Sequence, residues 1–444
     1  MALEASAIAL HDPSLLREQA FIDGEWCDAD NGARFEVTDP ATGEVLGCVP
    51  RMGAAETRRA VEAAERAQGD WARRPAAERA AILRRLSDLM LENRPDLARL
   101  LTLEQGKPLA ESVAEVTYAA SFYEWFGEEA KRVYGDTIPS PQRDKRILVT
   151  KHPIGVCGGI TPWNFPSAMV TRKSAPALAV GCTMVLKPAE QTPLSALAVA
   201  ELASRAGLPR GVLSIVTGAA EDAPAIGGEL TSNPVVRKVG FTGSNEVGKL
   251  IMRQCADGVK NVSLELGGNA PFIVFDDADL EQAVAGAVLC KFRNSGQTCI
   301  TANRILVHES LHDQFVAGLR EAAAKLVVGR GTERSSTVGP LIDEPAFDKV
   351  TRHVSDALDK GATPLLGGEP HALGGTFHQP TVLDGVAPDS HMWHEETFGP
   401  VAAVRTFTDE REAITVANDT PFGLAAYMYS RDVGRVFRVS EQLE

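Results

Sequence analysis

Seven cysteines occur in the sequence, and one of them, Cys299, stands in a segment, FRNSGQTCI, whose composition suits a reactive thiol. Ser295, Gly296 and Thr298 are small or turn-forming residues, so they allow the backbone to present the sulfur to a cleft. A nucleophilic cysteine needs such access and a means of stabilising its thiolate. A small buried residue is the other interpretation, and it is the better one for the remaining six cysteines.

Glu265 is the second residue with a chemical signature. In SLELGGNAP it lies near the end of an expected strand, between Leu264 and Leu266, and Gly267-Gly268 follow directly. A carboxylate between apolar neighbours is costly unless its side chain points into a cavity. Burial there raises the pKa of a carboxylate, which suits a general base that activates water. A glutamate at the strand edge that faces solvent explains the sequence equally well.

Asn164 lies in ITPWNFP, where two prolines bracket Trp163-Asn164 after a strand and before an expected helix. An amide held in place by such a backbone can donate a hydrogen bond to a developing oxyanion. An asparagine in this position more commonly caps a helix or closes a turn. Both roles stay open on the residues alone.

Two segments have features of a cofactor site. VLKPAE ends a strand at Lys187 and reaches Glu190 three residues later, and the carboxyl ends of parallel strands are where α/β sheets bind ligands. FTGSNEVG gives a strand, a turn at Gly243-Ser244 and a helix whose N-terminal amides suit a pyrophosphate. A surface salt bridge explains Lys187 and Glu190 equally well, and FTGS is a weak motif by itself.

The elements around these residues indicate an α/β fold. Hairpins are expected at FIDGEW and VTDPATGEV, and helices from about Ala54 to Glu129, interrupted by Pro75, Pro95 and Pro108. From residue 146 strands alternate with helices of about a dozen residues, which predicts parallel sheets. ILVTKHPIGVCGGI is interpreted as paired strands, and further helices are expected at 167–180, 193–207, 245–256, 280–292 and up to 327.

A second α/β set is expected to begin near Val262, at VSLELGG, and residues 361–400 are expected to be irregular because they are rich in glycine and proline.

The chain has 444 residues, 44% hydrophobic and 23% charged, with a formal net charge of −14. Such an acidic chain lacks the basic field of a nucleic-acid binder and is repelled by anionic lipid. Small-molecule partners are therefore expected, with no nucleic acid and no membrane.

The cysteines and histidines indicate in which cellular compartment the protein is expected and whether it has a metal site. The cysteine number is odd, no Cys-x-x-Cys pair occurs, and the nine histidines form no ligand-like cluster, so no disulfide framework and no metal site is expected. The N-terminus carries acidic residues early, and no apolar run is long enough to cross a bilayer. A cytoplasmic protein with reduced thiols is expected.

Six segments in this order, ITPWNFP, KPAE, FTGS, ELGGNAP, GQTC and EETFGP, together resemble the aldehyde dehydrogenase superfamily over nearly the whole chain. Any one of these segments can occur by chance in an unrelated protein, but all six in this order are highly specific for the superfamily. Within the superfamily, LTLEQGKPL, SFYEWFGEEAKRVYGD, MVTRK and KFRNSGQTC are most similar to succinate-semialdehyde dehydrogenases and their glutarate-semialdehyde relatives. The resemblance implies NAD(P)-dependent oxidation of a short aldehyde acid through a cysteine thiohemiacetal and thioester.

The resemblance also implies a role for each matching residue. Cys299 is expected as the nucleophile, Glu265 as the base, and the Asn164 side chain with the Cys299 backbone amide as the oxyanion hole. Glu396 and Phe398 are expected to position the nicotinamide. The other expected dinucleotide contacts are Trp163, Lys187, Glu190, Gly243 and Ser244.

The implied fold is a modified Rossmann cofactor domain, a catalytic α/β domain and a small oligomerisation hairpin. The corresponding ranges are 1–132 and 153–263 for the NAD-binding domain, 133–152 for the hairpin and 264–444 for the catalytic domain. A homo-oligomer, dimer or tetramer, is expected if the C-terminal strand of the family is not essential for assembly.

Cofactor and substrate preferences are expected from three positions. Glu190 beside the adenosine ribose accepts from a free 2′-hydroxyl and repels a 2′-phosphate, so NAD is preferred, with NADP possible. Arg172 and Arg293 match positions that grip the distal carboxylate of succinic semialdehyde. A surface ion pair is the alternative role for each arginine.

Two positions depart from the family pattern. Thr301 stands where some succinate-semialdehyde relatives carry a second cysteine, so no local disulfide switch is expected at Cys299. The chain stops at Glu444, before a family segment that holds a substrate-binding serine and a strand of the intersubunit sheet. Either the sequence is a piece of a longer chain or its pocket and assembly are compromised, so a catalytically weak homologue with a binding or structural role stays as an alternative. Glutarate semialdehyde or another aldehyde stays as the alternative substrate. A CoA-acylating enzyme is disfavoured because Glu265 would have little purpose there.

Overall fold

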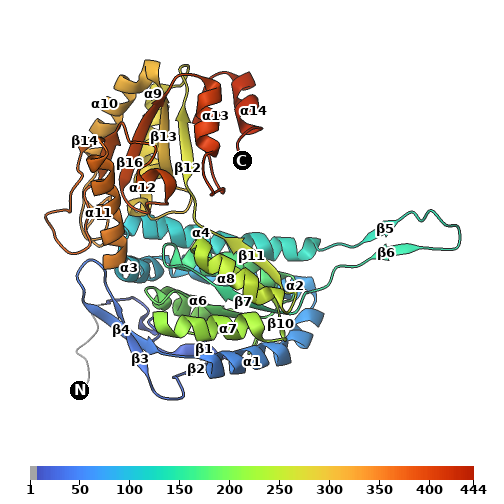
Figure 1. The fold of residues 1–444 in the computed structure, drawn as a ribbon. Helices are drawn as coiled ribbons and strands as arrows, with labels where there is room; N and C mark the ends of the chain where they lie inside the picture. Colours follow the sequence, from blue (N-terminus) through green and yellow to red (C-terminus); the bar gives the residue numbers. More distant parts are fainter. Residues whose placement is uncertain (1–7) are drawn as a thin grey trace. The chain divides into compact units, whose positions relative to one another are not determined.

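The computed structural model describes residues 8–444, which form two compact units (Figure 1). Unit 1 comprises the described part of Met1–Thr38 together with Val45–Glu104 and Ser112–Glu265. Unit 2 comprises Asp39–Glu44, Gln105–Glu111 and Leu266–Glu444. Each unit is built around its own mainly parallel sheet, as the alternation of strands and helices predicts.

The sheet of unit 1 has seven strands in the order β11-β10-β7-β8-β9-β1-β2. The five strands from β11 to β9 are parallel, and β1 and β2 are antiparallel. The strands are β1 Ala20–Ile22, β2 Glu25–Cys27, β7 Val156–Ile160, β8 Met184–Lys187, β9 Leu213–Ile215, β10 Val236–Thr242 and β11 Asn261–Glu265. The helices around it are α1 Ala54–Arg73, α2 Ala76–Glu92, α3 Arg94–Gln105, α4 Leu109–Glu129, α5 Pro166–Ala179, α6 Pro193–Arg205, α7 Ala223–Ser232 and α8 Asn245–Ala256.

The sheet of unit 2 has six strands in the order β14-β15-β16-β13-β12-β17, and only the β14–β15 pair is antiparallel. The strands are β12 Ala270–Val274, β13 Ala302–His308, β14 Thr363–Leu366, β15 Thr381–Asp384, β16 Val401–Phe407 and β17 Tyr427–Tyr429. The helices are α9 Leu280–Phe292, α10 His312–Ala323, α11 Glu344–Asp359, α12 His391–His394, α13 Glu410–Asn418 and α14 Val433–Ser440.

Most expected helices form where their patterns place them. Prolines separate the first four helices, and Pro95 is tolerated as the second residue of α3 because a helix start leaves its backbone N–H groups without helical partners. Helices α8 and α9 have the predicted bounds, 245–256 and 280–292. The local apolar period and the turn residues were therefore sufficient signals for these elements.

Three expectations about strands were wrong. The segment ILVTKHPIGVCGGI does not form two strands that pair with each other: β7 pairs with β8 and β10, whereas β6 (Ile147–Val149) pairs with β5 (Asp136–Ile138). Pro153 and the left-handed Gly155 (φ 117°) separate them. VSLELGG does not open the second α/β set, because β11 pairs in parallel with β10. Residues 361–400 contain β14, β15 and α12 rather than only irregular structure.

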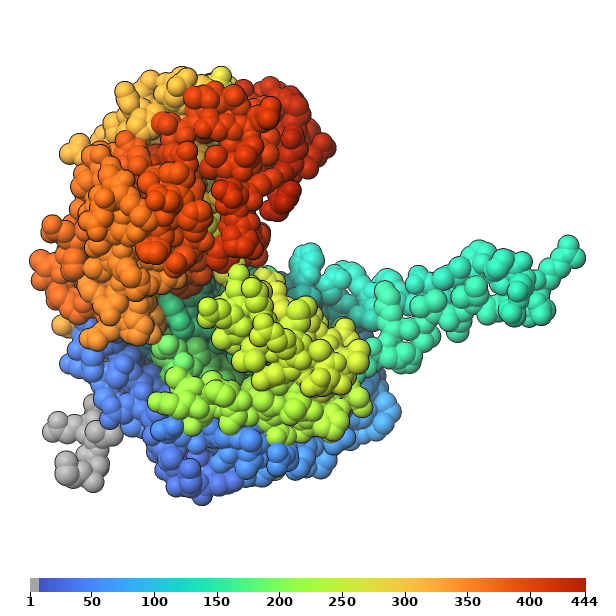
Figure 2. Space-filling model, viewed as in Figure 1, coloured from blue at the N-terminus to red at the C-terminus, as the bar shows by residue number. Residues whose placement is uncertain are grey.

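Two smaller antiparallel sheets complete unit 1. β3 (Arg34–Thr38) pairs with β4 (Val45–Pro50), and β5 pairs with β6. All six residues of β5 and β6 are exposed, and Figure 2 shows this hairpin, in teal, extending away from the rest of unit 1. Its exposed residues include Leu148, which is 73% accessible.

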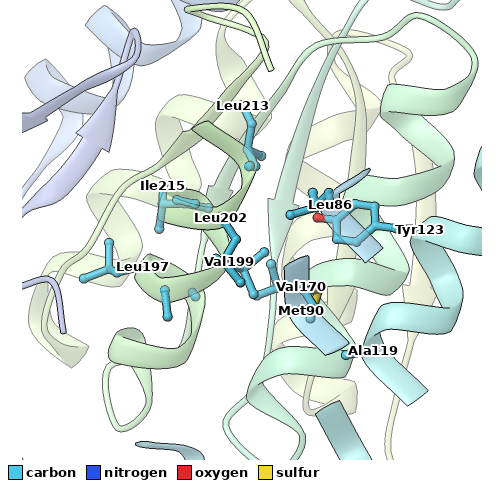
Figure 3. Packing of buried hydrophobic residues seen from close by; sticks show 14 of the residues in the cluster. Leu86, Met90, Ala119, Tyr123, Val170, Leu197, Val199, Leu202, Leu213 and Ile215 are labelled. Atoms are coloured by element: carbon cyan, nitrogen blue, oxygen red, sulfur yellow. The ribbon is translucent and has the colours of Figure 1, made fainter. Parts of the chain in front are cut away.

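The core of unit 1 includes Tyr123, a buried aromatic residue that also makes a polar contact. Figure 3 shows Leu86, Met90 and Tyr123 packed with side chains of α5 and α6. The Tyr123 hydroxyl is hydrogen-bonded to the Ser174 hydroxyl at 2.7 Å, so its buried oxygen is satisfied. The core therefore ties the α2–α4 layer to the helix that follows the ITPWNFP segment.

A buried carboxylate caps the start of α6. Glu104, which is fully buried near the end of α3, accepts hydrogen bonds from the backbone N–H groups of Leu194 and Ser195, both at 2.8 Å. These N–H groups have no helical acceptor at a helix start. Burial raises the pKa of Glu104 to about 8, against the lowering effect of these two N–H donors.

This raised pKa predicts a pH dependence of stability. The folded chain keeps the Glu104 proton up to about pH 8, whereas the unfolded chain loses it near the ordinary value of 4.5. The free energy of unfolding should therefore fall as pH rises through this window, on the order of a few kcal/mol in total. Glu104→Gln, which cannot titrate, should flatten that dependence in urea unfolding series at pH 5 and pH 8.

Glu104→Ala provides the comparison, because it removes both acceptor oxygens. It should lower stability by about 2–4 kcal/mol at pH 5. An equal pH slope in the wild-type chain and Glu104→Gln would contradict the assignment.

Candidate active site

Cys299 lies in unit 2 on the loop between α9 and β13, and it is half-buried. Three successive residues before it, Asn294, Ser295 and Gly296, have left-handed backbone angles, with φ of 52°, 55° and 73°. Non-glycine residues in this region cost free energy, and strained backbone clusters at functional sites. The small residues noted in the sequence thus mark a sharply turned segment that precedes the sulfur.

Hydrogen bonds from elsewhere in unit 2 hold this loop. The Asn294 N–H donates to the Glu111 carboxylate at 2.7 Å, and the Gln297 side-chain oxygen accepts from the Ile342 N–H at 3.0 Å. Both contacts involve buried members of the loop. They offset the strain of the left-handed run and keep the Cys299 backbone in one conformation.

Gly268 explains the glycine pair after Glu265. A Cβ atom on Gly268 would lie 2.3 Å from the Cys299 carbonyl oxygen, so only glycine fits against this loop. The Gly268 N–H donates to the Glu396 carboxylate at 3.1 Å. The backbone of Gly268 therefore contacts two sequence-predicted site residues, the Cys299 carbonyl and the Glu396 carboxylate.

Glu396 is half-buried, and two lysines lie near it. Burial raises the pKa of Glu396, while the Gly268 N–H, Lys349 and Lys291 act in the lowering direction. Lys291 is fully buried, and burial lowers its pKa to about 7. Phe398, two residues beyond Glu396, has a left-handed backbone with φ of 57°. The EETFGP segment is thus a second strained turn close to a buried charge.

The other predicted residues lie in unit 1: seven of them are at or just after the carboxyl ends of four adjacent parallel strands, and Arg172 is on α5. Register pairs Thr242 of β10 with Glu265 of β11, and Ile160 of β7 with Lys187 of β8. The Gly243 N–H donates to the Glu265 carbonyl at 3.0 Å. The sheet therefore gathers residues that are up to about 100 positions apart, at the edge where such sheets bind ligands.

Asn164 and Trp163 follow β7 and precede α5. Asn164 is only 4% exposed, and α5 begins at Pro166, as the bracketing prolines predict. Its amide is therefore fixed at the sheet edge rather than exposed on a surface turn.

Lys187 and Glu190 form a contact that suits hydroxyl groups. Lys187 is 4% exposed, and its Nζ donates to Glu190 Oε2 at 3.1 Å and to the Pro188 carbonyl at 3.1 Å. The burial of Lys187 argues against a mere surface salt bridge. A buried amine beside a half-exposed carboxylate supplies both a donor and an acceptor at one point.

Gly243 and Ser244 form the turn into α8. Ser244 is the N-cap residue, and its Oγ accepts from the Val247 N–H at 3.3 Å. A Cβ on Gly243 would lie 2.4 Å from the Phe241 ring, so a side chain does not fit there. The open first turn of this 12-residue helix suits an anionic group.

Glu265 lies between the two interpretations that the sequence left open, a buried base and a glutamate that faces solvent. Its side chain is 38% exposed, and Oε1 accepts from Arg172 Nη2 at 3.3 Å. Arg172 thus makes an ion pair, the alternative role that the sequence left open for it. Glu265 and Arg172 line a cavity of about 820 Å³ in unit 1. Lys173 lines it too, and burial lowers the pKa of Lys173 to about 8, against the raising effect of Glu265.

Arg293 is exposed in unit 2, at the C-terminal end of α9 and six residues before Cys299. Tyr427, which the sequence did not single out, lies close by, and its hydroxyl donates to the Ile300 carbonyl at 2.7 Å. Lys291 was also missed. A lysine that ends the otherwise apolar stretch AVAGAVLC is the signal that points to it.

The sequence-predicted residues thus form two groups. Cys299, Glu396, Phe398 and Arg293 belong to unit 2, and the remaining eight belong to unit 1. Within residues 8–444, no group of three or more His, Cys, Asp or Glu side chains is placed to hold a metal ion. No helix over the same residues has the length and apolar character needed to cross a bilayer.

Comparisons with known proteins identify close relatives. The model of the aldehyde dehydrogenase family matches residues 26–444. A glutarate-semialdehyde dehydrogenase of Pseudomonas aeruginosa is 62% identical over 98% of this chain and 89% of its own length. Succinate-semialdehyde dehydrogenase [NADP(+)] of Escherichia coli is 60% identical over 98% and 90%.

A solved structure agrees with the sequence comparisons. The crystal structure of succinate-semialdehyde dehydrogenase from Burkholderia pseudomallei superposes with a TM-score of 0.97 at 61% identity. The superposition covers 98% of this chain and 90% of that one. The similarity therefore extends over nearly all of both chains.

Proposed function

We propose that this chain, which belongs to the aldehyde dehydrogenase family, oxidises succinic semialdehyde to succinate with a nicotinamide dinucleotide as the hydride acceptor. The observation that carries the proposal is Cys299 on its strained and pinned loop. Relatives at 60–62% identity include both a succinate- and a glutarate-semialdehyde enzyme. Glutarate semialdehyde is therefore the main alternative substrate.

The chain's own residues have distinct tasks in this reaction. The Cys299 thiolate attacks the aldehyde carbon and forms a thiohemiacetal. The Asn164 side chain and the Cys299 backbone N–H donate to the oxyanion. A bound dinucleotide supplies the chemistry of accepting a hydride. Glu265 removes a proton from the water that hydrolyses the Cys299 thioester to the carboxylic acid.

The residues of unit 1 fit the adenosine end of a dinucleotide. Lys187 and Glu190 supply a donor and an acceptor for ribose hydroxyls at the end of β8. Gly243 lacks a side chain, Ser244 caps α8, and the N–H groups of the first turn of α8 suit a pyrophosphate. Trp163 lies beside the same strand ends. In unit 2, Glu396 and Phe398 are proposed to hold the nicotinamide end.

Arg172 has a different proposed task from the one expected. Its 3.3 Å contact with Glu265 orients the carboxylate of the base, since one guanidinium nitrogen donates to Oε1. Arg293, which is exposed near Cys299, is the remaining candidate to grip the substrate's distal carboxylate.

Assembly and compartment complete the proposal. The exposed apolar residues of the β5–β6 hairpin support a homo-oligomer, dimer or tetramer, as the task of this hairpin. The free cysteines support a cytoplasmic location.

A catalytically weak homologue with a binding or structural role is the alternative from another class. NADH formation at 340 nm over an aldehyde panel distinguishes an active dehydrogenase from such a homologue.

Loss of the Cys299 sulfur should abolish turnover. Cys299→Ala should lower kcat for succinic semialdehyde by about a thousandfold or more, because no covalent adduct forms. Cys27→Ser, a change at another half-buried cysteine, should leave kcat within about twofold. Near-normal turnover by Cys299→Ala, measured as dinucleotide reduction at 340 nm, would remove the mechanism.

Glu190 should set the preference for NAD over NADP. A carboxylate at this point repels a 2′-phosphate, so kcat/KM should be larger with NAD than with NADP. Glu190→Ser should shift the ratio toward NADP by about tenfold or more. The similar Escherichia coli enzyme carries NADP(+) in its name, so a wild-type chain that prefers NADP is the contrary result.

Arg293 should select for aldehydes that carry an acid group. Arg293→Ala should raise KM for succinic semialdehyde by about tenfold or more and leave KM for a neutral aldehyde of the same length nearly unchanged. Steady-state kinetics on the two substrates give the comparison, and Arg293→Lys serves as the charge-preserving control. Equal losses on both aldehydes would exclude a carboxylate-binding role.

A further inference from the structure

Two cysteines outside the proposed mechanism lie side by side in unit 1. Cys157 is on β7, and Cys182 is in the turn between α5 and β8. The Cys157 N–H donates to the Thr183 carbonyl at 2.8 Å, so the backbone of β7 contacts the residue next to Cys182. This hydrogen bond places β7 beside the turn that carries Cys182.

The two side chains are close enough for each thiol to shift the pKa of the other. The Cys157 thiol donates to the Gly155 carbonyl at 3.6 Å, and both cysteines are buried, at 4% and 2% exposure. The proximity of the two thiols raises the pKa of Cys157 and lowers the pKa of Cys182. The nearby Arg79 guanidinium also lowers the pKa of Cys182, so the pair has one thiolate-prone and one proton-holding member.

The pair borders a cavity in unit 1. Cys157 and Cys182 both line the cavity of about 820 Å³ that also holds Arg172 and Glu265. Its lining is rich in cationic groups, which favour a thiolate and attract anionic or polar oxidants. These cationic residues are Arg79, Lys151, Arg172, Lys173 and Lys238.

We propose that Cys157 and Cys182 form a redox-active dithiol that a peroxide converts to an intramolecular disulfide. The Cys182 thiolate attacks one peroxide oxygen, the O–O bond breaks, and the leaving hydroxide is protonated to water. Cys182 is then a sulfenic acid, oxidised by two electrons. The Cys157 sulfur attacks it, the S–O bond breaks, and the Cys157 proton leaves with the hydroxide as a second water.

The disulfide would have a structural consequence in unit 1. It would link β7 covalently to the turn that joins α5 to β8. Arg172 and Lys173 are on α5 and line the same cavity, so the cross-link fixes one wall beside the Glu265 carboxylate. The inference rests on this thiol pair and not on the proposed function.

Peptide mapping tests the proposal on the full chain. The reduced protein is treated with hydrogen peroxide, its remaining thiols are alkylated, and it is digested with trypsin without reductant. Trypsin leaves Cys157 in the peptide 152–172, Cys182 in 174–205 and Cys299 in 294–304. The expected product is peptide 152–172 joined to 174–205, at least about tenfold above its level in untreated protein and lost on adding dithiothreitol.

Variants identify the order of the two steps. Cys157→Ser should leave Cys182 as a sulfenic acid that dimedone traps, whereas Cys182→Ser should give neither the linked peptide nor a dimedone adduct on Cys157. Cys255→Ser, a change at another buried cysteine of unit 1, is the matched control and should give the wild-type yield. Thermal unfolding confirms that each variant is folded.

Cys299 supplies an internal standard for oxidation. Peroxide is raised until peptide 294–304 is oxidised, which shows that oxidant has reached the chain whatever its activity. If peptides 152–172 and 174–205 are then still fully alkylated and unlinked, the proposal is overturned. A linkage of Cys182 to any cysteine other than Cys157 would overturn it as well. Dehydrogenase assays are read separately, so failure of the proposed function leaves this result unaffected.

Discussion

The close approach of Gly268 to the Cys299 carbonyl is the constraint on which the catalytic loop depends. With 2.3 Å between that oxygen and the position of any Cβ, the contact exists only because residue 268 lacks a side chain. The same glycine donates its N–H to Glu396. One backbone unit thus contacts both the nucleophile's loop and the half-buried Glu396 carboxylate.

Strain and electrostatics divide between the two units. Unit 2 holds the left-handed run before Cys299, the left-handed Phe398 and the buried Lys291. Unit 1 is regular at its strand ends, and its unusual feature is charge: the ion pair of Arg172 with Glu265 beside a largely buried Lys173. A reaction that needs a fixed sulfur and a movable proton acceptor is consistent with this division. The thiol pair of Cys157 and Cys182 adds a second reactive group to the same wall of unit 1.

The sequence alone was sufficient wherever the signal is local. Apolar spacing, prolines and capping residues gave α8 and α9 their bounds, and the prolines around Trp163-Asn164 placed the start of α5 correctly. The ordered motifs also gave the family, because six short segments together carry more information than any helix pattern. The bounds of these helices depend on residues within about one turn of each other, whereas the family follows from the order of short segments along the chain.

Tertiary structure decided what depends on distant partners. The strand that carries Glu265 joined the first sheet rather than the second because β10 was available as its parallel neighbour. Arg172 turned toward Glu265, 93 residues away, and the thiol of Cys182 came close to that of Cys157. Glu104 is buried because its carboxyl group caps the start of α6. Side-chain charge, burial and thiol proximity are set by neighbours that the chain brings together only on folding, so local patterns do not contain them.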